Sequence, residues 1–192
     1  MAEEDYPWYD YTVCGKTLEQ GDIIENCKII IPSDEAYESL LNDTVTDSIS
    51  EFVEHHCIIL SQSCDLQNEK IESVIVCPIL SLKELITNGG NGDFYRSKSA
   101  REQLRQGNQP AYHLLNKVAI GSENEDYYCV SFRTIYSVPK SYLIALVGYK
   151  KRIRLLPPYR EHLSQSFARY FMRVGLPSGI PSDEMKHYNY TT

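Results

Sequence analysis

The feature that most restricts the fold of this chain is a series of short apolar runs, each about as long as a β-strand. The runs at 23–31 and 71–79 are rich in isoleucine and valine, and Pro32 and Pro78 mark their ends. Further extended runs are expected at 57–61, 111–119, 127–135, 142–149 and 153–156. Because no regular helical crossovers separate these runs, they predict a mainly β (α+β) fold, a small twisted barrel or sheet, rather than a doubly wound parallel sheet.

Insertions interrupt the strand pattern. Residues 33–54 are acidic and rich in serine and threonine, which predicts a long exposed insertion that is partly helical over 34–41. Ser81 is suited to be the N-cap of a short helix at 82–86. Residues 98–106 have the composition of a second short helix.

The chain is expected to end in an amphipathic helix over 158–175. Apolar residues recur there with the 3.6-residue period, and Gly175 and Pro177 supply an ending signal. The apolar face, which predicts that the helix lies across the barrel, consists of Leu163, Phe167, Tyr170, Phe171 and Val174. Residues 1–20 form an aromatic lead-in that we expect to be extended, and the length of 192 residues predicts one domain, 1–192.

Charge is divided unevenly along the chain. Residues 1–60 hold fourteen acidic residues against two lysines, whereas residues 150–173 hold seven lysines and arginines against Glu161. One interpretation is that the acidic half folds against the basic half, and the other is a basic groove for RNA or for an acidic partner. Because the whole chain has a net charge of −7, the first interpretation is favoured.

Composition predicts a soluble, cytoplasmic protein. No apolar stretch approaches the roughly 20 residues that a membrane span needs. Residues 1–12 are acidic and aromatic, unlike the basic start of a signal peptide. We therefore expect six reduced thiols, none in a Cys-x-x-Cys pair: Cys14, Cys27, Cys57, Cys64, Cys77 and Cys129.

Motifs for common catalytic sites are absent from the sequence. It has no phosphate-binding loop, no dinucleotide fingerprint, no nucleophile elbow and no His-Glu-x-x-His pair. His55, His56 and Cys57 are a tight cluster of metal-type ligands, but neighbours on a strand point to opposite faces. We therefore expect no metal site and no cofactor.

The most distinctive run is the polar loop that follows the apolar strand at 57–60. Five small or polar residues stand there, where loops usually carry function: Ser61, Gln62, Ser63, Cys64 and Asp65. They either close a tight turn through side-chain hydrogen bonds to the backbone or form a binding site. A carboxylate beside Cys64 would raise the pKa of the thiol, which argues against a cysteine nucleophile.

Three segments together resemble the opening of the MazF/PemK toxin superfamily. They are Gly-Asp-Ile-Ile at 21–24, Cys-Ile-Ile-Leu-Ser-Gln at 57–62 and Val-Ile-Val-Cys-Pro-Ile at 74–79. The resemblance covers about residues 21–80 and implies an SH3-like barrel of the MazF/PemK type with helical insertions. The loop at 61–66 and the segments at 158–165 and 174–177 also resemble a broad group of uncharacterised bacterial proteins.

The resemblance also implies two hypotheses about function. Ribonuclease members of the superfamily carry a catalytic arginine where this chain has His55 and His56, and a catalytic threonine or serine where it has Ser81. The missing arginine favours the first hypothesis, a cytoplasmic bacterial regulatory protein of defence, CRISPR-associated or toxin–antitoxin type. Its barrel would bind a protein partner, such as a protease or sigma factor, and a homodimer is compatible with this role. The alternative is a metal-independent endoribonuclease that cleaves single-stranded RNA with His56, Ser81 and an arginine from elsewhere in the chain.

Three arginines of the terminal helix complete the candidate site. Arg160, Arg169 and Arg173 are not needed for the apolar face. We expect them and the loop 61–66 to form one recognition surface, because guanidinium groups bind carboxylates and phosphates. The alternative is that these arginines pair with the acidic half of the same chain.

Overall fold

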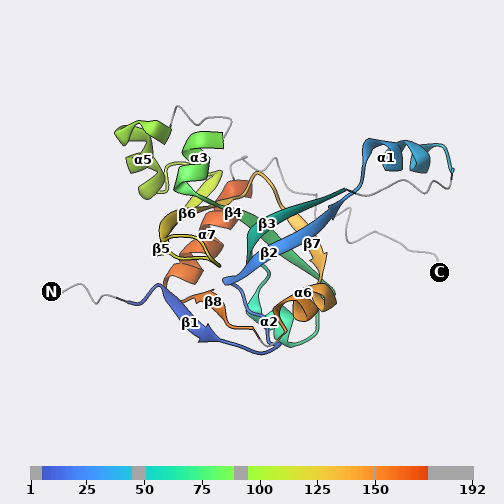
Figure 1. Ribbon diagram of the computed structural model, residues 1–192, viewed down its shortest axis with the longest axis horizontal. Coiled ribbons are helices and arrows are strands. Elements are labelled where there is room, and N and C mark those ends of the chain that lie inside the picture. Colours follow the sequence, from blue (N-terminus) through green and yellow to red (C-terminus); the bar gives the residue numbers. More distant parts are fainter. Residues whose placement is uncertain (1–5, 45–50, 89–94, 149, 173–192) are drawn as a thin grey trace, which may run out of the picture.

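A bent antiparallel sheet forms the centre of the molecule (Figure 1). The computed structural model describes residues 6–44, 51–88, 95–148 and 150–172. The strands are β1 Tyr9–Val13, β2 Asp22–Ile31, β3 Glu51–Ile59, β4 Ser73–Ser81, β5 Tyr112–Val118, β6 Asp126–Ser131, β7 Tyr136–Pro139 and β8 Arg152–Leu155. They pair in the order β1-β8-β2-β3-β4-β6-β5, and β7 pairs with β4.

Helices fill the connections and the end of the described chain. They are α1 Asp34–Leu41, α2 Ser63–Gln67, α3 Leu82–Asn88, α5 Lys98–Arg105, α6 Lys140–Val147 and α7 Tyr159–Phe171. The expected α+β fold with a helix after the last strand is therefore confirmed. None of the helices within the described ranges is long and apolar enough to cross a membrane.

The sheet rolls around a core but does not close into the expected barrel. Side chains from β1, β6, β8 and α7 meet in one apolar cluster on its inner face. The end strands approach each other there, since the Tyr9 hydroxyl of β1 donates to the Asn116 carbonyl of β5 over 2.8 Å. In the described part of the chain, however, no backbone pairing joins β1 to β5. A single side-chain bond replaces the ladder that barrel closure would require.

Two further clusters cover the outer faces of the sheet. Residues of β2, β3, β4 and β7 pack against α2 and α6, and residues of β6 pack against α3 and α5. The prediction of an extended segment at 142–149 is wrong, because most of these residues belong to helix α6. Its Leu143 and Val147 lie four residues apart and are buried in the first of these outer clusters. A short run that is apolar all round has no period to separate strand from helix, so tertiary packing decided.

The terminal helix packs as its period predicts along most of its length. Leu163 is fully buried, and the Phe167 ring lies 5.4 Å from the ring of Phe132 in the inner core. Phe171 was expected in the same face but is 57% exposed at the last residue of α7. The predicted helical residues 173–175 lie outside the described residues.

The acidic insertion is shorter than the sequence suggested, because β3 begins at Glu51. Its helical part agrees with the expectation, since α1 spans Asp34–Leu41 behind an N-cap hydrogen bond from Ala36 N–H to Ser33 Oγ. Figure 1 shows β2 and β3 running outward from the rest of the sheet and carrying α1 at their outer end.

Candidate functional site

The polar loop after β3 is held in place by its own serines. Ser61 Oγ accepts a hydrogen bond from Ile75 N–H over 2.8 Å, and Ser63 Oγ accepts one from Gln20 N–H over 3.1 Å. Ser61 is also buried. Both hydroxyls therefore join this segment to the backbone of other segments, Ser61 to β4 and Ser63 to the residues before β2, rather than closing a turn locally.

The same loop contacts the terminal helix. Gln62 Nε2 donates to Ser164 Oγ of α7 over 3.2 Å, and Gln20 Nε2 donates to the Leu60 carbonyl over 2.8 Å. Cys64 and Asp65 follow in α2, where Cys64 is exposed, Asp65 is half-buried, and 3.7 Å separates the thiol sulfur from Asp65 Oδ1. The structure thus brings the loop and the first turns of α7 together.

A buried carboxylate, Asp22, holds the most concentrated group of charges. Asp22 Oδ2 accepts from Arg152 Nε over 2.8 Å and from an Arg154 terminal nitrogen over 3.0 Å. Glu19 binds the same Arg154 over 2.6 Å. The Asp22 side chain is fully buried and that of Arg152 is 4% exposed. Each charge therefore needs the other to offset its loss of hydration. Here the acidic half of the chain does pair with the basic half.

This network fixes the segment before β2 against β8. The Arg152 guanidinium also donates to the carbonyls of Gly15 and Thr17. Gly21 has a φ of +86°, and a Cβ there would lie 3.1 Å from Leu155 Cβ and 3.2 Å from Leu155 O. Gly21 and Asp22 open the first segment of the MazF/PemK resemblance. The glycine permits a close strand approach, and the aspartate pairs with two arginines.

Two of the three helix arginines lie in the described residues, and their surroundings differ. Arg160 lies 3.7 Å from Glu19 and 2.8 Å from Glu161, so it belongs with the charges around Asp22. Arg169 lines a cavity beside α5 and β5. Arg173 lies outside the described residues. The recognition surface of loop and arginines stays a prediction.

Ser81 is a helix cap. Its Oγ accepts from Glu84 N–H over 3.1 Å, and Glu84 Oε2 accepts from Ser81 N–H over 2.8 Å. These reciprocal bonds form a capping box, which satisfies two backbone donors at the start of α3. The cap expected from the sequence is confirmed, and the Ser81 hydroxyl oxygen accepts the hydrogen bond that makes it.

His56 is held by backbone on one side and by a carboxylate on the other. Its Nδ1 accepts from Asn26 N–H over 3.2 Å, and its Nε2 lies 3.5 Å from Glu123 Oε1. Glu123 also accepts a hydrogen bond from the Tyr128 hydroxyl. Burial, together with this hydrogen bond, raises the pKa of Tyr128. His55 lies apart from this chain of bonds, with its ring 6.1 Å from that of Tyr136.

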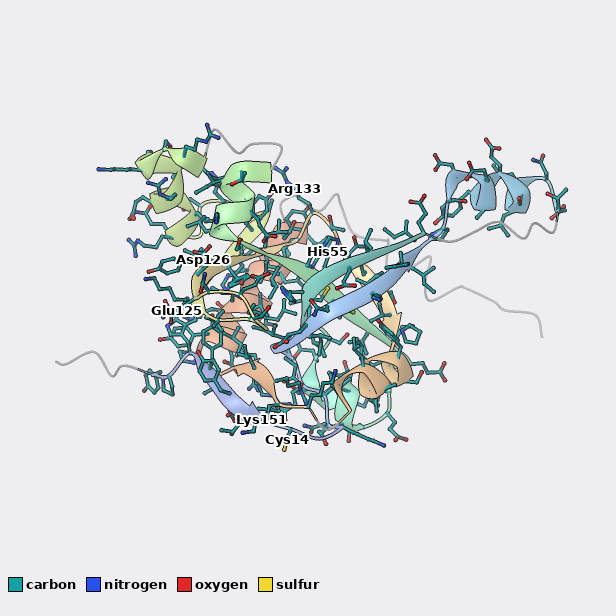
Figure 2. The ribbon with its side chains drawn as sticks, viewed as in Figure 1. Cys14, His55, Glu125, Asp126, Arg133 and Lys151 are labelled. Carbon is teal, nitrogen blue, oxygen red and sulfur yellow. The ribbon has the colours of Figure 1, made fainter. Side chains whose placement is uncertain are left out.

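Ser81 lies in a surface cavity of about 630 Å³ together with Tyr128 and Lys83. Four carboxylates also line it: Glu84, Glu123, Glu125 and Asp126. Figure 2 shows Glu125 and Asp126 on one flank of the molecule. Among the described lining residues there is no arginine. Four carboxylates outnumber the one lysine of this lining, Lys83, so the cavity repels a phosphate backbone.

The outer part of the β2–β3 hairpin is a surface that the sequence analysis did not single out. We call residues 30–43 and 51–52 the arm. Five large apolar side chains of the arm are between 56% and 85% exposed: Ile30, Tyr37, Leu40, Leu41 and Phe52. Helix α1 has no buried residue. The arm also holds five acidic residues and no lysine or arginine.

Comparisons of this chain with protein-family models and with curated proteins found no match. Its function is therefore inferred from the geometry described above. Within the described ranges, no three histidine, cysteine, aspartate or glutamate side chains are grouped so that they could hold a metal ion.

Proposed function

We propose that this chain is a protein-binding module and that the arm is its contact surface. The observation that supports this is the grouping of Ile30, Tyr37, Leu40, Leu41 and Phe52 on an outward-pointing element. Single exposed apolar residues are ordinary, but a group of them on one projecting element marks an interaction site. Burying one such side chain against a partner contributes roughly 1.5–3 kcal/mol.

The charges of the arm specify the chemistry of its partner. Asp34, Glu35 and Glu38 lie on α1 among the apolar residues, with Asp43 after it and Glu51 on the neighbouring strand. An amphipathic acidic helix fits an apolar groove whose rim carries lysines or arginines. A second copy would present the same negative charges, and nucleic acid would be repelled. We therefore assign a protein partner with a basic-rimmed apolar groove.

This proposal develops the hypothesis drawn from the MazF/PemK resemblance. In that hypothesis a toxin-like sheet serves a regulatory role in a defence or toxin–antitoxin system, with a protease or sigma factor as partner. The arm supplies a contact surface for such a role. RNA cleavage by His56 and Ser81 has no comparable support, because Ser81 caps α3 and His56 faces Glu123.

The test begins with a photo-crosslinking residue placed at Leu41 in living cells. The matched control places it at Ile135, which is 38% exposed and lies outside the arm. A partner captured from Leu41 but not from Ile135 is then purified, and its affinity is measured by calorimetry. We expect the double variant L40S/L41S to bind at least about tenfold more weakly, since two buried leucines are lost.

Three outcomes would overturn the proposal. The first is equal affinity of the wild type and L40S/L41S. The second is an equal loss of affinity in I135S, and the third is a partner whose contact surface lacks basic residues. Sedimentation of the purified chain distinguishes self-association, because an arm-mediated homodimer would dissociate in L40S/L41S. Thermal unfolding of the double variant should match that of the wild type, because α1 buries nothing.

A further inference from the structure

A second cavity, of about 290 Å³, lies between the end of α5, strand β5 and helix α7. Its polar lining includes Arg105, Gln106, His113, His162, Gln165 and Arg169. Every ionisable side chain among the described lining residues is therefore basic. In a chain with a net charge of −7, a cavity without a carboxylate selects for a negatively charged ligand.

His113 is the buried part of this lining. Its Nδ1 lies 3.0 Å from Ser166 Oγ on α7. Its Nε2 is buried and has no hydrogen-bond partner among the described residues. A buried polar atom left without a hydrogen-bond partner is destabilising, so such atoms call for an explanation. When Ser166 donates to Nδ1, Nε2 carries the proton and is a donor.

Arg169 is the exposed part of the same lining. Within the described part of the chain it makes no ion pair or side-chain hydrogen bond. Its neighbour Arg105 is already paired, with bonds of 2.8 Å and 2.6 Å to Glu102. Arg160 is likewise paired, with Glu161. Arg169 is thus the cation of this cavity that has a free planar fork for an oxyanion.

We infer that this cavity binds the phosphate group of a small phosphorylated ligand, with Arg169 and His113 as its two principal contacts. Arg169 supplies the charge and a bidentate fork, and the His113 imidazole lies in the same lining. The volume is close to the lower end of ligand pockets, which span roughly 300–1,000 Å³, so the site suits a small ligand. This inference is independent of the arm and of protein binding.

The test uses the full-length chain and inorganic phosphate at constant ionic strength, with chloride as the exchanged anion. Phosphate binding is followed by NMR of the histidine ring signals. We expect saturable shifts of the His113 and His162 signals, and a dissociation constant at least about tenfold weaker in R169Q. The matched control is K151Q, which removes the same charge from an exposed residue outside this cavity. Its affinity should equal that of the wild type.

A second arm of the test distinguishes phosphate from other parts of a ligand. A nucleoside monophosphate should perturb the same signals, and the nucleoside alone should not. The variant S166A tests the buried contact without removing the imidazole, and it should weaken phosphate binding. Shifts that do not saturate, that are equal in R169Q, or that the nucleoside alone produces would overturn the inference. Equal losses in R169Q and K151Q would show non-specific charge screening and would also overturn it.

Discussion

Lowering the pH should destabilise this protein through one buried imidazole, that of His113. Burial lowers the pKa of His113 from its ordinary 6.5 to about 4, and the nearby His162 adds to this effect. Arg105 and Arg169 line the same cavity between α5, β5 and α7 as His113, and both are cations. Because the pKa is lower in the folded state than in the unfolded state, the unfolded chain binds the proton more tightly.

The sign and size of the effect follow from these two pKa values. The stability that neutral His113 contributes is fully present above pH 6.5 and is lost as the pH falls through 4. The difference between the two values corresponds to a loss of about 3 kcal/mol. That is a large part of the roughly 5–15 kcal/mol that stabilises a typical domain.

The assay is urea denaturation from pH 7.5 down to pH 3.5 for the wild type and for H113Q. Glutamine retains a hydrogen-bonding group but does not titrate. Carboxylates titrate in both proteins, so the difference between the two free energies of unfolding isolates His113. We expect H113Q to be less stable at pH 7.5 and to lose its disadvantage progressively below pH 6.5. A difference that stays constant across this range would refute the reasoning.

Three further results are expected. D22N should lower the free energy of unfolding by about 3 kcal/mol or more, because the buried Arg152 loses its counter-charge and Arg154 loses one of two. D65N removes a charge from the more exposed pair with Lys70 and should change the free energy of unfolding by less than about 1 kcal/mol; urea denaturation measures both. S81A should lower the free energy of unfolding by about 1 kcal/mol in the same assay, because α3 loses its cap. If S81A changed the cleavage of a long single-stranded RNA, the assignment of Ser81 as a structural cap would be contradicted. Thiol titration should find six free groups in the denatured chain, and in the native chain Cys14 and Cys64 should react first because they are exposed. A stable disulfide would contradict the last result.

Several parts of this structure could be predicted from short stretches of sequence. The strands at β2 and β4 follow from β-branched residues, and the α3 cap follows from Ser81. Pro32 follows the end of β2, but Pro78 lies inside β4, which continues to Ser81, so the expected end at Pro78 is wrong. The position of α7 follows from the helical period of its apolar residues. In each case the deciding interaction joins residues that are close along the chain, so the sequence alone is enough to predict it.

Local pattern failed where packing decided the outcome. Helix α6 was expected to be extended, because its residues are apolar on several sides and are buried by different neighbours. Phe171 has the correct period for burial but lies where α7 ends, beyond the core that covers Phe167. The arm was interpreted as an acidic insertion, and only the structure shows its apolar side chains pointing away from any core.

The sequence by itself determined that acidic and basic residues lie in opposite parts of this chain and favoured their pairing. Only the tertiary structure decided which residues pair. Asp22 meets Arg152 and Arg154 because β2 and β8 are neighbours in the sheet, with Asp22 opposite Arg154, although 132 positions separate them in sequence. His113 comes to lie under Ser166 of α7 in the same way. Burial and charge at both sites depend on strand order and helix docking, which are set by the sum of many distant contacts rather than by any local pattern.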